Sequence, residues 1–193
     1  MPGGRSKMEP IYPAPCRRLE IPVLLFSYAH PLRVYGPERF SQKAKESGVA
    51  GILVGDLPFE EAWELKQFSN PAGLDFISPI APATSADRLR KIADRAQGFL
   101  YCISIVGLTG TARPVLTVLW PEVARVRKTS DLPLVAGFDL SEPEQVRDIA
   151  PIAEGVVVGS ALVRMIFELA RRKDEIDRIS DFVHRLNKNR VRV

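Results

Sequence analysis

The fold of this chain is constrained most by a short apolar run that ends near glycine or serine, is followed by a helical pattern, and recurs along the sequence. Successive run ends lie roughly 22 to 34 residues apart, the length of one strand-and-helix unit. The runs are almost continuously apolar, which is typical of parallel strands that helices cover on both faces. The predicted strands are residues 23–26, 51–54, 76–77, 99–103, 134–135 and 156–158. The predicted helices are residues 37–47, 58–68, 85–96, 115–128, 141–150 and 161–171.

Consecutive strand-and-helix units predict an α/β chain of the (β/α)8 TIM-barrel type, here incomplete. A complete barrel has eight units and about 250 residues, whereas this chain has 193 residues and about six units, which we expect to be strands three to eight. Residues 1–20 are rich in proline and contain no periodic pattern. We therefore expect a disordered or poorly specified leader over residues 1–20 and a partial barrel domain over residues 21–193.

Two predicted helices have recognisable start signals. Pro58 suits the first turn of a helix, where its missing N–H would have no partner in any case. Ser141 and Glu144 have the spacing of a capping box. These signals predict helices directly after the second and fifth strands.

The charge balance is mildly basic, with 27 Lys and Arg against 23 Asp and Glu and a net charge of +4. Basic residues gather near the C-terminus. In the same segment the apolar residues Ile176, Ile179, Val183 and Leu186 recur at helical spacing. We interpret these charges as the solvated side of a C-terminal amphipathic helix, and we expect no nucleic acid partner.

Composition also limits the compartment and the cofactors. No apolar stretch approaches the roughly 20 residues of a membrane helix, and the leader lacks the apolar core of a signal peptide. We therefore expect a cytoplasmic protein that does not bind membranes. Cys16 and Cys102 are the two cysteines, and they provide neither a disulfide framework nor a metal-ligand spacing, so no metal site is predicted.

Three strand ends have the chemistry of an anion site. Residues 107–110 (Gly-Leu-Thr-Gly) follow the fourth strand, Gly137 and Phe138 end the fifth, and Gly159 and Ser160 follow the sixth. Glycine at such a point leaves backbone N–H groups accessible to an anion. A single glycine can serve only a turn, but three such strand ends together predict a phosphorylated small-molecule ligand.

These motifs also carry a family resemblance. Residues 27–31 (Ser-Tyr-Ala-His-Pro), 55–61 (Gly-Asp-Leu-Pro-Phe-Glu-Glu), 78–82 (Ser-Pro-Ile-Ala-Pro), 107–113 (Gly-Leu-Thr-Gly-Thr-Ala-Arg) and 159–163 (Gly-Ser-Ala-Leu-Val) resemble the tryptophan synthase alpha chain in order and spacing. The resemblance covers about residues 21–170.

The resemblance implies a carbon–carbon lyase of tryptophan biosynthesis. It would split indole-3-glycerol phosphate into indole and glyceraldehyde 3-phosphate, and it would pass the indole to a tryptophan synthase beta chain in an alpha2beta2 assembly. The alpha chain itself would need no cofactor, because pyridoxal phosphate belongs to the beta chain.

The resemblance also implies roles for individual residues. The substrate phosphate would be held by Gly110, Gly137, Phe138, Gly159 and Ser160. The substrate pocket would include Phe26 and Tyr28 around the indole, Tyr101, and Thr109 of a mobile loop. Asp56 would couple that loop to the beta-chain interface.

Each of these side chains has a simpler interpretation as well. Tyr28 and Tyr101 could fill the barrel, with the hydroxyl bonded locally. Asp56 could cap the helix that Pro58 opens. His30 replaces an asparagine of the family, and we favour a local hydrogen-bonding role for it over catalysis.

Two departures from the family pattern bear on activity. The reaction needs a general acid and a general base, which in the family are a glutamate on the second strand and an aspartate in the following loop. Neither Glu9 nor Glu20 matches that motif, so no catalytic residue is identified and the isolated chain is expected to be inactive. Asp139 replaces a family glycine, where it could face the phosphate or cap the helix that starts near Ser141.

Two other functions remain open from the sequence. One is a non-catalytic partner or activator of a tryptophan synthase beta chain. The other is a different phosphate-binding barrel, such as a sugar-phosphate isomerase.

Overall fold

The computed structural model describes Cys16, residues 19–103, Pro121, and residues 123–137, 140–169 and 174–188. The chain divides into two compact units, Met1–Phe76 (unit 1) and Ile77–Val193 (unit 2). Each unit is described by itself below.

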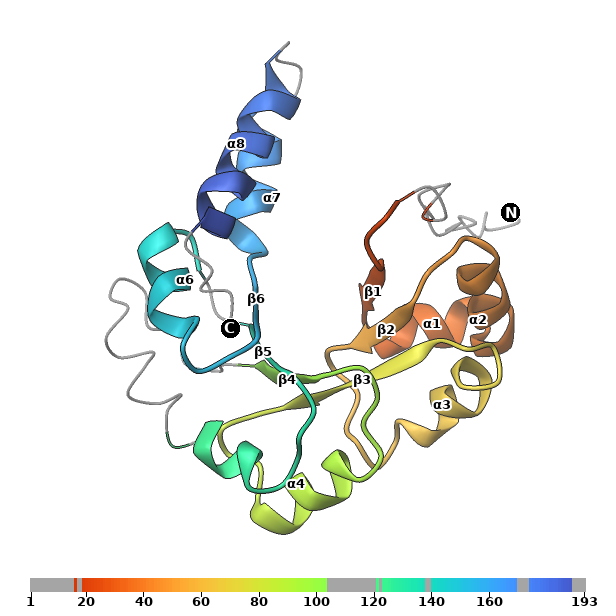
Figure 1. The fold of residues 1–193 in the computed structure, drawn as a ribbon. Helices are drawn as coiled ribbons and strands as arrows, with labels where there is room; N and C mark the ends of the chain where they lie inside the picture. Colours follow the sequence, from red (N-terminus) through yellow and green to blue (C-terminus); the bar gives the residue numbers. More distant parts are fainter. Residues whose placement is uncertain are drawn as a thin grey trace, which may run out of the picture. The chain divides into compact units, whose positions relative to one another are not determined.

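The described residues of unit 1 form two parallel strands, the start of a third strand and three helices. Residues of β1 and β2 pair in parallel, with Phe26 opposite Leu53, and the N–H of Asp75 at the start of β3 donates to the Ala50 carbonyl at 3.0 Å. The elements in chain order are β1 (Leu24–Ser27), α1 (Ala29–Tyr35), α2 (Pro37–Glu46), β2 (Gly51–Val54), α3 (Trp63–Ser69) and the first residues of β3 (Asp75–Ile80) (Figure 1).

Burial in unit 1 differs between its two strands. All four residues of β2 are buried, as expected for a strand covered on both faces. On β1, by contrast, Leu24 and Phe26 remain exposed, so the prediction of a strand covered on both faces does not hold there. Cys16, within the predicted leader, is buried in the core of this unit together with Phe40.

The described residues of unit 2 form the rest of β3 and three further parallel strands. Strand β3 pairs with β4, β4 with β5 and β5 with β6, each in parallel. Its other elements are α4 (Ala86–Ala93), β4 (Leu100–Ile103), β5 (Leu134–Gly137), α6 (Pro143–Ile149), β6 (Gly155–Val157), α7 (Ser160–Leu169) and α8 (Glu175–Lys188) (Figure 1).

The strand order is the chain order, from β1 to β6. Parallel strands in this order, alternating with helices, confirm the predicted succession of strand-and-helix units in a (β/α)8-type fold.

The C-terminal helix α8 is amphipathic, but its buried face differs from the predicted one. Phe182 and Leu186 are buried and pack against α6 and α7, whereas Ile176 and Val183 are exposed. The predicted stripe was therefore wrong at Ile176 and Val183, because the buried face is the one that Phe182 and Leu186 share at a spacing of four residues.

Three helix starts also differ from the prediction. Helix α1 was not predicted. Helix α3 begins at Trp63, after turns in which the Pro58 carbonyl accepts from the N–H groups of Glu61 and Ala62. The capping box of α6 consists of Glu142 and Gln145, rather than Ser141 and Glu144.

Two further findings concern the described residues alone. None of their helices is long and apolar enough to cross a bilayer. Within the same residues, no group of three or more His, Cys, Asp or Glu side chains could hold a metal ion.

Candidate functional site

An aromatic pair at the end of β1, with Phe26 in the strand and Tyr28 directly after it, lies in unit 1 and faces solvent. Phe26 is 63% exposed and Tyr28 is 61% exposed. Their ring centroids are 6.3 Å apart with the planes tilted by 40°. Neither ring fills the core, so the simpler interpretation of Tyr28 as a barrel-filling residue is wrong. The pair offers an apolar surface that a planar aromatic ligand could contact.

Gly55, at the end of β2, makes room for this pair. A Cβ atom on Gly55 would lie 2.7 Å from Cε2 and 3.0 Å from Cζ of Phe26. The Phe26 ring therefore occupies the space that a side chain at position 55 would need.

Asp56 caps a helix, but not the one that follows it. Its Oδ1 accepts a hydrogen bond from the N–H of Ala29, the first residue of α1, at 2.7 Å. The simpler interpretation from the sequence was that Asp56 caps the helix after Pro58. This is wrong, because Asp56 bonds the start of α1 instead. Unit 1 brings Phe26, Tyr28 and Asp56 together at the ends of β1 and β2.

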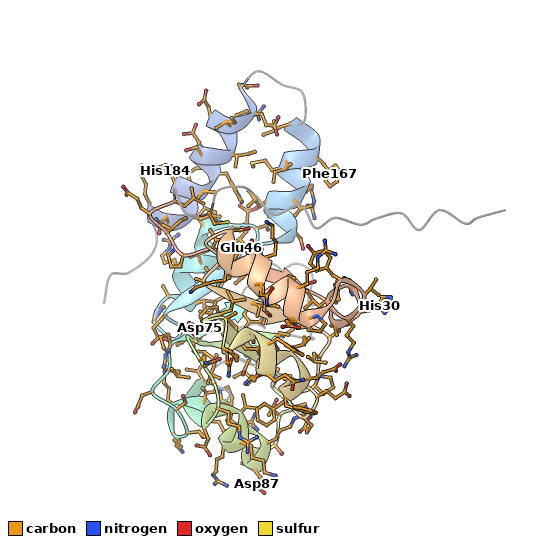
Figure 2. All side chains as sticks on the ribbon, turned by 90° about the vertical axis from the view of Figure 1, so that its right-hand side faces the viewer. His30, Glu46, Asp75, Asp87, Phe167 and His184 are labelled. Atoms are coloured by element: carbon orange, nitrogen blue, oxygen red, sulfur yellow. The ribbon has the colours of Figure 1, made fainter. Side chains whose placement is uncertain are left out.

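Sequence reasoning missed an ion cluster close to this point. Arg33 of α1 contacts Glu64 of α3 at 2.9 Å and Glu61 at 3.5 Å. The hydrogen bond to Glu64 is the main cause that raises the pKa of Arg33 above its ordinary value. The only sequence signal was the acidic run at residues 60–64, which fits the solvated face of a helix equally well. His30 lies exposed on the first turn of α1 (Figure 2), and its local hydrogen-bonding role stays a prediction.

In unit 2, Tyr101 lies against Gly137. Tyr101 is buried, and a Cβ atom on Gly137 would lie 2.0 Å from its hydroxyl oxygen. Burial, with a smaller contribution from Cys102, raises the pKa of Tyr101, so the hydroxyl stays protonated at neutral pH and can donate a hydrogen bond. The structure thus gives Gly137 a packing reason, while its contact with phosphate stays a prediction.

Gly159 and Ser160 form the start of α7. The Gly159 carbonyl accepts the first intrahelical hydrogen bond, from the N–H of Val163 at 3.0 Å. Among the described residues, no atom lies within 4 Å of a Cβ atom built on Gly159, and both residues are exposed. The first turn of α7 contains no acidic residue. Because the first N–H groups of a helix have no intrahelical partner, this end of α7 can accept an anion.

The other predicted site residues lie outside the described part of the chain. These residues are Thr109, Gly110, Phe138 and Asp139.

Comparison with known proteins shows the family of the chain. The model of the tryptophan synthase alpha chain family matches residues 8–191. This chain belongs to the tryptophan synthase alpha chain family. The resemblance deduced from the motifs at residues 55–61 and 107–113 is confirmed.

Individual relatives agree with this assignment. The tryptophan synthase alpha chain of Geotalea uraniireducens is 42% identical over 168 residues, which cover 86% of this chain and 62% of the relative. That of Geobacillus kaustophilus is 43% identical over 154 residues, covering 80% of this chain and 57% of the relative. The chain thus spans about three fifths of the length of the curated relatives it matches.

Solved structures of the family share the fold. The alpha chain of Legionella pneumophila is 33% identical, with a TM-score of 0.77 over 88% of this chain and 63% of that one. A mutant alpha-subunit from the hyperthermophile Pyrococcus furiosus is also 33% identical, with a TM-score of 0.77 over 89% of this chain and 69% of that one.

Proposed function

We propose that this chain supplies the substrate-binding part of an alpha-chain active site in tryptophan biosynthesis. The reaction of that site is the cleavage of indole-3-glycerol phosphate into indole and glyceraldehyde 3-phosphate. The observation that carries the proposal is the start of α7 at Gly159 and Ser160, where the first turn has no acidic residue and the described residues leave space around Gly159. This start lies in a chain that the family model matches almost throughout.

The chemistry at this helix start suits a phosphate. The substrate phosphate carries negative charge, and unpaired N–H groups together with the helix dipole favour an anion there. The Ser160 hydroxyl adds a further donor. In the proposal, Gly110, Gly137 and Phe138 complete this phosphate site.

The indole part of the substrate would meet aromatic side chains. Phe26 and Tyr28 offer exposed ring faces in unit 1. The protonated hydroxyl of Tyr101 in unit 2 suits a neutral hydrogen-bond donor to substrate, because burial keeps its pKa high. Thr109 would contribute from the loop after β4.

Proton transfer is the step for which no residue is assigned. The reaction needs a general acid and a general base beside the substrate. Asp56 bonds the α1 N-terminus, and we give it no proton-transfer role. We therefore propose that the 193-residue polypeptide by itself binds substrate without turning it over.

Partner and compartment form part of the same proposal. The expected partner is a tryptophan synthase beta chain, which would hold the pyridoxal phosphate and take up the indole. The expected compartment is the cytoplasm, where the substrate and the other enzymes of a biosynthetic route would be found.

A second candidate function is a non-catalytic partner of the beta chain. Two features favour this candidate, because they present a defined charged surface. They are the turns over residues 58–62 and the ion pairs of Arg33 with Glu61 and Glu64. This surface includes part of the segment that the resemblance places toward the beta chain.

An indole-release assay tests the proposed function. We expect the purified polypeptide to release no indole from indole-3-glycerol phosphate above background, while titration calorimetry detects binding of the substrate. Release that persists after Tyr101→Phe but disappears after Glu9→Gln would show that a leader residue is the catalytic acid. Co-purification with a beta chain, in the absence of substrate binding, would favour the second candidate.

A further inference from the structure

Two consecutive residues after β2 hold the backbone on both sides of Tyr28. The N–H of Gly55 donates to the Ser27 carbonyl at 3.1 Å. On the other side, the N–H of Ala29 donates to Asp56 Oδ1 at 2.7 Å. The peptide groups before and after Tyr28 are thus both fixed by the neighbouring strand end.

Helix α1 depends on this contact, because its own sequence provides no cap. Tyr28 is the N-cap residue, with φ −106° and ψ 158°, and its side chain makes no capping hydrogen bond. The first turn of α1 contains no acidic residue, and Pro31 in that turn has no N–H group. Asp56 therefore supplies both an acceptor and a negative charge to the helix start.

Gly55 fixes the other member of the aromatic pair. A Cβ atom at this position would overlap the Phe26 ring, with 2.7 Å to Cε2. The ring therefore stays where it lies only while residue 55 is glycine. The two neighbours Gly55 and Asp56 thus set the positions of Phe26 and Tyr28, respectively.

We propose that Asp56 is a positioning residue, which acts through the N–H of Ala29 to hold Tyr28, and with it the aromatic pair, in the orientation that receives the indole ring. The proposal rests on the proposed function for its ligand. It assigns Asp56 no contact with substrate. Its effect is to order the exposed pair before a ligand arrives, which lowers the entropic cost of binding.

Amide exchange tests the positioning step without any ligand. In the full 193-residue chain, Asp56→Ala should speed hydrogen exchange at the Ala29 N–H about fivefold or more, since the acceptor of this N–H is lost. Asp56→Asn keeps a side-chain oxygen and should retain most of the protection. Glu38→Ala is the matched control, because Glu38 is an exposed acidic residue in the first turn of α2 and should leave Ala29 unchanged.

Indole binding tests the consequence for the site. With indole itself as the probe in titration calorimetry, Asp56→Ala should weaken affinity about fivefold. Asp56→Asn and Glu38→Ala should stay within about twofold of the wild-type chain. Rescue by the asparagine separates positioning from a general loss of folding, and circular dichroism checks that each variant is folded.

The possible results decide between the two proposals. Unchanged exchange at Ala29 in Asp56→Ala, or equal indole affinity of Asp56→Ala and the wild-type chain, overturns the positioning role. A wild-type chain that binds neither indole nor indole-3-glycerol phosphate contradicts the proposed function instead, and amide exchange then still decides whether Asp56 holds Tyr28.

Discussion

Gly137 is a single residue whose packing role the structure shows, while its contact with phosphate stays a prediction. The sequence singled it out as a phosphate contact, whereas the structure places the Tyr101 side chain in the space that any larger residue would need. Tyr101 is itself held in a buried position on β4. A substitution at Gly137 should therefore disturb the packing of Tyr101 in the core, whatever its effect on ligand binding.

Replacing Gly137 with alanine should destabilise unit 2. The added Cβ would overlap the hydroxyl oxygen of Tyr101, and forcing an extra carbon into a packed interior costs about 1–3 kcal/mol. Thermal unfolding followed by circular dichroism would measure the loss. Gly159→Ala is the control, because the space around Gly159 is open, and an equal loss in both variants would refute the packing role.

At the scale of elements, Glu154 links its own segment, just before β6, to two other segments of unit 2. Its carboxylate accepts from Arg127, in the helical segment at residues 123–127, and from the N–H of Leu134 in β5 at 2.7 Å. Partial burial acts to raise the pKa of Glu154, but the bonds from Arg127 and Leu134 outweigh it, and the pKa lies below its ordinary value of 4.5. The ionised form therefore supports the start of β5.

Glu154→Gln should lower stability at neutral pH and matter less in acid. Because the folded pKa is depressed, the contribution of Glu154 is present above about pH 4.5 and disappears as the pH falls through the folded pKa. Since the side chain is 51% exposed, we expect an effect of about 0.5 kcal/mol. Denaturant unfolding at pH 7 and pH 3 measures it, with Glu144→Gln as the matched control. A difference that grows toward pH 3 would contradict this account.

The sequence predicted the strands better than the helix starts, for physical reasons. Residues 51–54 were predicted as a strand and form β2 with the same bounds, because a buried parallel strand is marked by its own apolar run. Helix α1 was missed because its cap comes from Asp56, 27 positions away from Ala29, which no local pattern reveals. The capping box of α6 was predicted at Ser141 and Glu144, one residue before its actual position at Glu142 and Gln145. The prediction chose Ser141 because serine is the commoner N-cap residue.

The candidate site was predicted as a set of positions but not as a set of contacts. Sequence resemblance predicted Phe26 and Tyr28 as pocket residues, yet it could not show that Gly55 makes room for the first ring and that Asp56 holds the backbone beside the second. Such roles depend on side chains from neighbouring strands that are far apart in sequence.

At the scale of the whole molecule, apolar surface remains exposed in both units. Unit 1 exposes Leu24 on β1, and unit 2 exposes Phe167 on α7, which is 79% accessible. Phe167 projects from the side of α7 opposite α8 (Figure 2). Exposed apolar side chains of this size favour association.

We therefore expect the purified chain to self-associate with rising concentration. Phe167→Glu should shift sedimentation profiles toward monomer, because it places a charge on the exposed apolar face of α7. Asn187→Glu, which adds the same charge to the exposed side of α8, should leave the profile unchanged. A monomeric, cooperatively melting wild-type chain at all concentrations would contradict this expectation.

The affinity of the chain for glycerol 3-phosphate, compared between two substitutions at Gly159, tests the central claim most directly. Gly159→Ala fits the open space at the start of α7 and should change affinity by less than about twofold. Gly159→Asp should weaken it more than about tenfold, because the carboxylate takes the place of the phosphate at the helix N-terminus. Aspartate is a favourable N-cap, so helix α7 should remain intact. Equal affinity of the two variants in titration calorimetry would contradict a phosphate site at this helix.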